Sequence, residues 1–206
     1  RLSTSLAMGA GNLTVMTGLS SESRWPEVSS EKLDDLIMVA SHHFDFVVLD
    51  VASPISPGLV SLTSSVERNS VSRWAVTYSD KLIAVCGADP ISVARFLSAA
   101  TQVSELQPKG EVLTLVNRLR TSVLGPSAKR QIAETLSRMG QITVNGFIPD
   151  DPAAADSAIK ESLPIALGRR NSQARLAIAL FTRTQVLGER NQLDGRLAKR
   201  AVAKLG

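Results

Sequence analysis

An apolar run at residues 46–49 that ends at Asp50 constrains the fold of this chain more than any other stretch. A continuous run of this kind is typical of a strand buried on both faces, as in a parallel sheet covered by helices. We therefore predict a buried strand over 44–50. Ligands of open α/β sheets bind at the carboxyl ends of the strands, where the Asp50 carboxylate can hold a hydrated Mg²⁺ beside a phosphate. The alternative is an aspartate that only closes a strand–loop junction.

Strand and helix patterns alternate along the rest of the chain. Strands are predicted at 13–17, 81–86, 111–116 and 142–148, and helices at 33–40, 66–79, 89–106, 125–139, 153–161 and 172–187. Met139 and Ile178 are placed on the buried faces of their helices. Such alternation predicts an α/β fold with a doubly wound, mostly parallel sheet and helices on both faces. One domain at 1–188 and a separate tail at 189–206 are expected.

Composition excludes several classes of protein. Among 206 residues the net charge is +4, of which +3 falls in 189–206, so the body carries no signal for nucleic-acid binding. The single Cys86 excludes an internal disulfide and fits a reducing cytoplasm. No apolar run is long enough to cross a bilayer. A cytoplasmic location is therefore expected, with attachment at the inner face of the membrane as an open alternative.

Polar residues close two further predicted strands. Asn117 follows one of them, and its amide can both donate and accept, which suits the edge of a purine base. Pro149 and Asp150 close the next, where main-chain groups can lie against a base. Asparagine after a strand is more often a turn residue, so each signal is weak by itself. Their order along the chain is more informative than any one of them.

Four stretches, taken in order, resemble the later half of a MinD/ParA-type ATPase. They are Phe-Asp-Phe-Val-Val-Leu-Asp at 44–50, Asp-Lys-Leu-Ile-Ala-Val at 80–85, Leu-Val-Asn-Arg at 115–118 and Gly-Phe-Ile-Pro-Asp at 146–150. The first is similar to the Walker B strand of that family. Two further stretches, at 14–18 and 24–26, are similar to the Leu-Thr-Gly and Arg-Trp-Pro motifs of the CpaE/TadZ branch. That branch positions pilus-assembly and secretion machinery.

The resemblance implies a P-loop NTPase-like fold that binds ATP and Mg²⁺ and works as a homodimer. It implies Asp50 as the catalytic residue and metal ligand. It also implies Asn117 and Arg118 at the adenine, with Pro149 and Asp150 forming the wall of the base pocket. The function implied is an ATPase that positions a pilus, secretion or partitioning assembly.

The chain also departs from that family. No Gly-Lys-Ser/Thr occurs in the 206 residues, so the first strand–loop–helix with its phosphate-binding loop is absent. After Asp50 no glycine occurs before Gly58, and the Ser/Pro/Gly-rich loop 52–58 is expected to be mobile. We predict that this chain alone does not hydrolyse ATP. The alternatives are a non-catalytic dimerisation and recruitment scaffold with a decayed nucleotide site, and an unrelated doubly wound domain with a small-molecule site.

The 189–206 tail has apolar residues four apart, at Leu193, Leu197, Ala201 and Leu205, among basic residues. This pattern predicts a basic amphipathic helix that docks on an acidic membrane surface or a protein partner. The alternative, which is the more common role of such a tail, is a solvated helix packed loosely on the body.

Overall fold

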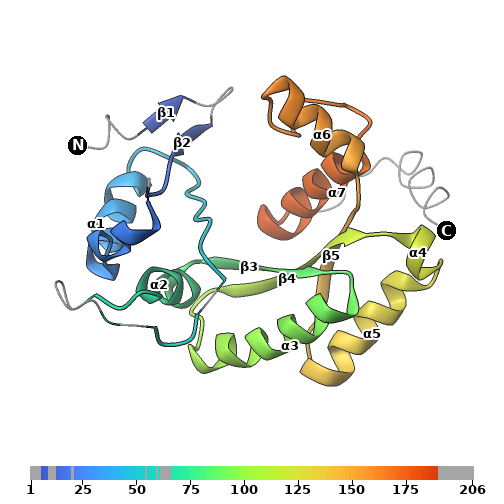
Figure 1. The fold of residues 1–206 in the computed structure, drawn as a ribbon, viewed down its shortest axis with the longest axis horizontal. Coiled ribbons are helices and arrows are strands. Elements are labelled where there is room, and N and C mark those ends of the chain that lie inside the picture. The colour runs from blue at the N-terminus through green and yellow to red at the C-terminus, as the bar shows by residue number, and fades with distance from the viewer. Residues whose placement is uncertain are drawn as a thin grey trace. The chain divides into compact units, whose positions relative to one another are not determined.

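A computed structural model describes residues 6–8, 13–19, 21–53, 55–58, 60 and 66–189 of the chain. Most of the predicted tail and Pro54 lie outside these residues. The chain divides into two compact units, one of residues 1–79 with 102–109 and one of residues 80–101 with 110–206. Each unit is described by itself below, and Figure 1 labels their elements.

The first unit contains a small antiparallel ladder and two helices. Its elements are β1 (Leu6–Met8), β2 (Thr14–Met16), the 3₁₀ helix η2 (Glu22–Glu27), α1 (Ser30–Ser41) and α2 (Ser70–Tyr78). The predicted strand at 13–17 is confirmed as β2, which pairs with β1. Helix α1 begins where the Ser29 hydroxyl accepts a hydrogen bond from the Lys32 N–H at 3.4 Å, a standard N-cap.

The predicted buried strand at 44–50 is wrong for this structure. The segment forms no strand, and Phe46 and Val48 are 67% and 89% exposed. The physical reason is that a strand is buried on both faces only when neighbouring strands and helices enclose it. No described strand pairs with 44–50, and Phe46 and Val48 are left largely exposed.

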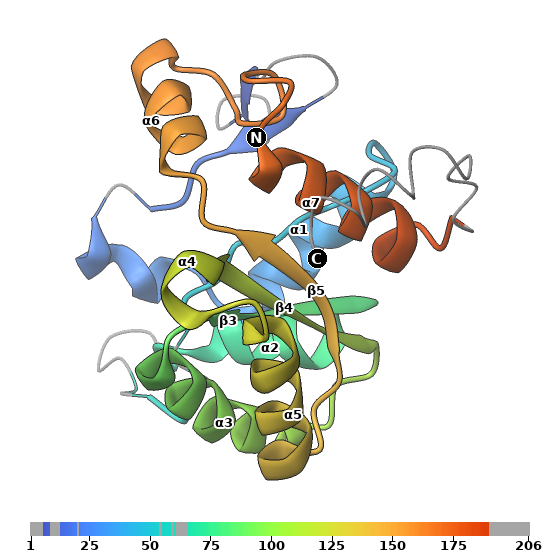
Figure 2. The same cartoon turned by 90° about the vertical axis from the view of Figure 1, so that its right-hand side faces the viewer.

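The second unit is built on a parallel sheet of order β3-β4-β5. Its elements are β3 (Lys81–Gly87), α3 (Pro90–Glu105), β4 (Glu111–Leu119), α4 (Thr121–Leu124), α5 (Ala128–Gly140), β5 (Val144–Pro149), α6 (Pro152–Glu161), α7 (Gln173–Phe181) and the π-helix η3 (Thr182–Val186). Figures 1 and 2 show α3 and α5 below this sheet and α7 above it. The predicted α/β class, with a parallel sheet flanked by helices, is confirmed.

Each face of the sheet has its own core. On the α3/α5 side, Cys86 and Val116 pack with Val93, Ile132 and Leu136. On the α7 side the cluster consists of Leu113, Leu115, Ile148, Ala174 and Phe181. The alternation of β4 residues between the two clusters follows from the two-residue period of a strand.

Strand β3 is covered less completely than β4. It pairs with β4 along one side, and no described strand pairs with its other side. Cys86 is buried, whereas Ile83 and Val85, which point to the opposite face, are 41% and 56% exposed. Within the described residues β3 is therefore an edge strand with an open apolar face, a place where another strand and helix can add.

The Asn145 side chain repairs a break in the ladder between β4 and β5. The register moves from Thr114 opposite Val144 to Leu115 opposite Gly146, which leaves Asn145 as an extra residue on β5. The Asn145 carbonyl oxygen accepts from the buried Thr114 N–H at 2.8 Å. A side-chain oxygen thus replaces the missing main-chain acceptor, and a buried donor is not left unpaired.

In two helices the predicted buried face includes a residue that the structure exposes. Met139 is 65% exposed, because α5 turns it away from the cluster that holds Ile132 and Leu136. Ile178 is 41% exposed, because α7 covers β4 and β5 through Ala174 and Phe181 and leaves its flank open. In both helices the buried stripe is narrower than the run of apolar residues in the sequence.

Candidate functional site

The carboxyl ends of β3, β4 and β5 meet at one edge of the second unit's sheet. Gly87 stands opposite Asn117, and Leu119 stands opposite Pro149. The Ala88 N–H donates to the Asn117 carbonyl at 3.1 Å, and the Asp150 N–H donates to the Leu119 carbonyl at 3.0 Å. The structure thus brings Asn117, Arg118, Pro149 and Asp150 onto adjacent strand ends, while their binding roles stay predictions.

A β-bulge shapes the end of β4. Between Val116, opposite Phe147, and Leu119, opposite Pro149, β4 takes three residue steps where β5 takes two. Arg118 accommodates the extra residue with a backbone φ of 57°. This angle lies in the left-handed region, which residues other than glycine and asparagine rarely adopt. Bulges and left-handed residues of this kind occur next to binding sites, where they redirect a side chain. The sequence offers no glycine here to signal it.

The Asn117 amide is oriented by the main chain of the bulge. Its carbonyl oxygen Oδ1 accepts from the Arg118 N–H at 2.8 Å. Because a peptide N–H only donates, the atom facing it must be the oxygen, so the Nδ2 group occupies the other side of the amide. Asn117 itself is partly exposed at the sheet edge.

Asp150 forms a solvent-exposed ion pair with Arg120. Its carboxylate lies 3.7 Å from Arg120 Nε, with side-chain exposures of 29% and 61% for Asp150 and Arg120. An ion pair this exposed contributes little to stability, which leaves both groups able to exchange partners with a ligand. The pair is consistent with a wall residue and does not resemble a catalytic carboxylate buried against a positive charge.

The neighbouring Asp151 was not among the predicted site residues. Its carboxylate has a structural role at this edge. Its two oxygens accept from the Ala154 N–H at 3.1 Å and from the Ser172 hydroxyl at 2.7 Å. Ser172 in turn caps α7 by accepting from the Arg175 N–H, so Asp151 ties the first turns of α6 and α7 together. The Ser172 hydrogen bond is the main cause that holds the pKa of Asp151 below 3.8. The signal that could have found it is the Asp-Pro pair, an N-cap followed by proline.

An Asp-Pro pair also stands at the end of β3, and it begins the helix predicted at 89–106. Asp89 accepts from the Ser92 N–H at 2.9 Å and from the Ser92 hydroxyl at 2.6 Å, just before α3. These bonds lower the pKa of Asp89, with the hydroxyl as the larger cause. The α3 N-terminus is therefore satisfied by a carboxylate of the chain itself and offers no anion site.

Asp50 belongs to the first unit, in the extended 44–50 segment, and is exposed. Part of the loop that follows, whose predicted mobility stays a prediction, forms hydrogen bonds with residues just before α2. The Gly58 N–H donates to Glu67 Oε1 at 2.9 Å, and Asn69 Nδ2 donates to the Ser56 carbonyl at 2.8 Å. Residues 55–58 are thus anchored on the turn that precedes α2.

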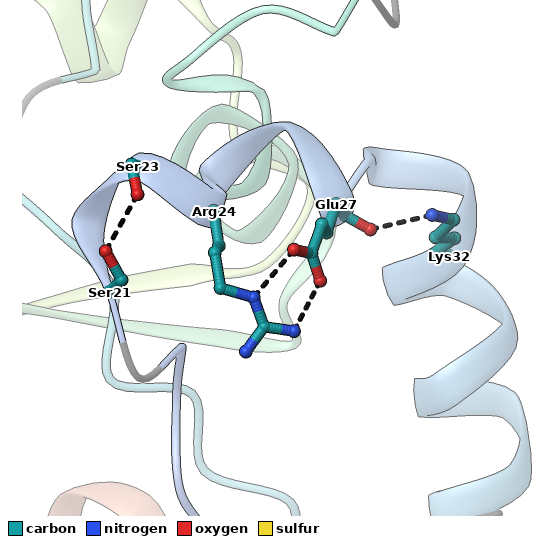
Figure 3. Close-up of polar contacts among 5 residues, drawn as sticks. All are labelled: Ser21, Ser23, Arg24, Glu27 and Lys32. Atoms are coloured by element: carbon teal, nitrogen blue, oxygen red, sulfur yellow. Dashed lines mark hydrogen bonds and ion pairs between the residues drawn. The ribbon is translucent and has the colours of Figure 1, made fainter.

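Arg24, in the predicted Arg-Trp-Pro motif, has a local structural role. Figure 3 shows two parallel hydrogen bonds from its guanidinium to the Glu27 carboxylate, both 2.6 Å long. Lys32 Nζ donates to the Glu27 carbonyl at 2.7 Å, which ties η2 to the first turn of α1. The bond to Arg24 is the main cause that lowers the pKa of Glu27. These contacts connect two helices of the first unit.

Other reactive groups are accounted for within the described residues. Cys86 is buried in the core cluster on the α3/α5 side, and this burial raises the pKa of its thiol to about 11. The described residues contain no group of three histidine, cysteine or acidic side chains that could hold a metal ion. None of the described helices combines the length and apolar character that a membrane span requires.

Comparison with known proteins gives a structural likeness and no match by sequence. No protein-family model matches the chain, and no curated protein matches it significantly. The crystal structure of a ParA family ATPase from Chlorobium tepidum TLS superimposes with a TM-score of 0.67 at 18% identity, over 87% of this chain and 66% of that chain. At this identity the likeness shows a shared fold, P-loop NTPase-like, with this chain spanning less than two thirds of the other.

Proposed function

We propose that this chain is the base-binding part of a MinD/ParA-like ATP-binding protein. The observation that carries the proposal is the sheet edge at which Asn117 and Arg118 lie beside Pro149 and Asp150. In an α/β sheet of this type that edge is where ligands bind. The Asn117 amide and the main chain of the strand ends can hydrogen-bond to a purine base, and the Asp150–Arg120 pair can border it. None of these groups is suited to bind the phosphates, which we assign to another part of the protein.

A segment outside these 206 residues would supply the phosphate-binding loop. The chain contains no Gly-Lys-Ser/Thr, and the helix N-terminus of α3, the nearest to the edge of β3, is occupied by Asp89. The open edge and face of β3, with Ile83 and Val85 exposed, offer a place for an added strand and helix. The exposed 44–50 segment equally needs a neighbouring strand to bury Phe46 and Val48.

Asp50 fits a magnesium role by its chemistry. Mg²⁺ is commonly held by one or two carboxylates, with water and phosphate oxygens completing the shell, so one aspartate is a sufficient protein contribution. A bound Mg²⁺ would neutralise charge on the phosphates. In this proposal Asp50 is the residue that would hold the ion.

A titration with ATP and with AMP tests the proposal. Because the phosphate cradle is absent, both nucleotides are expected to bind this chain weakly and within about threefold of each other. NMR shift changes are expected at 117–120 and 149–150. Asn117→Ala should weaken binding by about tenfold, whereas Arg138→Ala, at the far end of α5, should not. No phosphate release is expected.

Two results would contradict this proposal in different ways. ATP turnover by this chain that Asp50→Ala abolishes would show that the phosphate site is already complete. Absence of any nucleotide binding would favour the second candidate, a non-catalytic scaffold that keeps the fold for dimerisation and partner recruitment. The scaffold gains support from the 55–58 loop, which follows Asp50 and is tied to Glu67 and Asn69.

We further propose that the intact protein positions a pilus, secretion or partitioning assembly as an ATP-bridged homodimer, with 189–206 docking on an anionic membrane. If so, Leu197→Asp should remove most co-sedimentation of the chain with anionic vesicles, since it places a charge in the apolar stripe. Neutral vesicles are the control. Equal sedimentation of the two proteins would leave the tail without a membrane role.

A further inference from the structure

We propose that one surface of the second unit docks on an anionic lipid bilayer. This α7 surface consists of two exposed leucines of α7 and three exposed residues of the loop before it: Leu167, Arg169, Arg170, Leu176 and Leu180. All five are described by the structure, and they share no residue with the strand-end site or with the predicted 189–206 tail. The α7 surface is therefore a separate element of membrane attachment, which can be tested independently of both.

Helix α7 is apolar on every side. Seven of its nine residues are apolar, and the two polar ones lie in its first turn. Ala174 and Phe181 belong to the core on the sheet. The helical period turns Leu176 and Leu180 away from the sheet, and their exposed fractions are 48% and 47%. A helix that is apolar all round is normally buried, so this outer face requires a cover.

The loop before α7 is held against the first turn of that helix by Arg175. Its Nε donates to the Ala166 carbonyl at 2.9 Å, and its Nη1 donates to the Arg170 carbonyl at 3.3 Å. Leu167, which lies between these two carbonyls in the chain, is 54% exposed. The loop therefore extends the exposed apolar face of α7 beyond the end of the helix.

The charges around this face have one sign. Residues 162–188 contain four arginines and no acidic residue. Arg175 holds the loop, and Arg183 forms an ion pair. Arg169 and Arg170 are exposed, and neither forms an ion pair with a residue that the structure describes. Positive charges beside aliphatic side chains are complementary to an anionic surface with an apolar layer beneath it.

A bilayer fits this combination better than other partners do. A second copy of the α7 surface would bring unpaired arginines against each other, which like charges disfavour. Nucleic acid would satisfy the arginines but leave the leucines in water, since its recognition uses phosphate contacts and base stacking. A helix added on the open face of β3 would pack on the sheet beside α7 and would not reach the side turned away from it. In a bilayer the leucines enter the boundary between headgroups and acyl chains, and the arginines meet the anionic headgroups.

The first test reports contact at the α7 surface itself. Leu180→Cys is labelled with a polarity-sensitive thiol dye, and Cys86 escapes labelling in the folded chain because it is buried. The emission should shift to the blue with phosphatidylglycerol vesicles and much less with phosphatidylcholine vesicles. Met139→Cys is the control, at a 65% exposed position of α5 on the other side of the sheet (Figure 1), and its dye should not respond. A dye at residue 180 that does not respond to anionic vesicles would overturn the proposal.

The second test measures flotation of the full chain with phosphatidylglycerol vesicles. Leu180→Asp should weaken binding by about tenfold, because it places a charge where an apolar contact is required. Replacing Arg169 and Arg170 together with alanine should weaken binding at low salt and remove most of its salt dependence. Met139→Asp, which adds the same charge at another exposed site, should bind like the wild type. Urea unfolding verifies that each variant is folded.

The outcomes separate this proposal from the membrane role of the tail and from nucleotide binding. Unchanged flotation of Leu180→Asp, with loss in Leu197→Asp, would overturn the α7 surface and leave the tail in place. Loss in Leu180→Asp, with none in Leu197→Asp, would support the α7 surface alone. A dye response to duplex DNA without one to vesicles would also overturn the proposal. Nucleotide titration of Leu180→Asp should match the wild type, since residue 180 lies outside the strand-end site.

Discussion

Replacing Phe181 with alanine is expected to destabilise the second unit by about 3–5 kcal/mol. Its ring, 6% exposed, belongs to the α7-side cluster with Leu113, Leu115 and Ile148. The ring also lies directly over Gly146, where an added Cβ would come within 2.8 Å of it. A cavity at this place would open between α7 and two strands that cannot close onto it, because the sheet is held by its own hydrogen bonds.

Urea unfolding measures this effect, with Leu180→Ala as the matched control. Leu180 lies one residue earlier in the same helix and is 47% exposed, so its truncation should cost clearly less, about 1 kcal/mol. Gly146→Ala should destabilise by about 1–3 kcal/mol through overpacking, and Phe181→Leu in the same chain should recover part of that loss. Equal costs for Phe181→Ala and Leu180→Ala would show that α7 is not docked through Phe181.

Replacing Asp151 with alanine is expected to cost about 2–3 kcal/mol at pH 7, since it removes the cap of α6 and the acceptor of the Ser172 hydroxyl in one step. Asp151→Asn should cost less, because an amide oxygen can still accept from the Ala154 N–H. Asp156→Ala, on the exposed side of α6, is the control and should change stability by less than about 0.5 kcal/mol.

The contribution of Asp151 should also depend on pH in a defined direction. The Ser172 hydroxyl and nearby main-chain N–H groups lower the pKa of Asp151 in the folded state, so its stabilising contribution is fully present above the ordinary pKa of an unfolded aspartate. Stability is lost as pH falls through the lower, folded pKa, because the native state must then take up a proton it resists. The gap between wild type and Asp151→Asn in urea unfolding should therefore shrink from pH 7 to pH 3. A gap that widens on acidification would contradict this assignment.

Much of the second unit could be predicted because its signals are local. Three stretches have the apolar content and bounding turns that are typical of buried strands, at 81–86, 111–116 and 142–148. They correspond to β3, β4 and β5 in the structure. The helix predicted from residue 89 is α3, and Asp89 accepts a hydrogen bond from its first turn. The placement of Asn117 and Pro149 at strand ends followed from the same patterns, because parallel strands end at a common edge.

The features missed are those that depend on what lies across the ladder. Nothing in the residues around Arg118 indicates a left-handed turn, since the bulge arises from the mismatch of steps between β4 and β5. Asn145 serves as a surrogate acceptor only because the register shift between β4 and β5 brings its side chain to the Thr114 N–H. Asp151 joins two helices through Ser172, which lies 21 residues further along the chain, and no local pattern links them to each other.

What the sequence determined by itself was therefore the class of fold, the strands of the parallel sheet and the edge at which they end, since these follow from periodicity, strand-end residues and chain order. The tertiary structure alone decided which apolar runs are buried and how the polar side chains are oriented. The 44–50 run shows why: burial and hydrogen-bond orientation belong to pairs of elements, and an apolar strand pattern has no buried face until a neighbour supplies one.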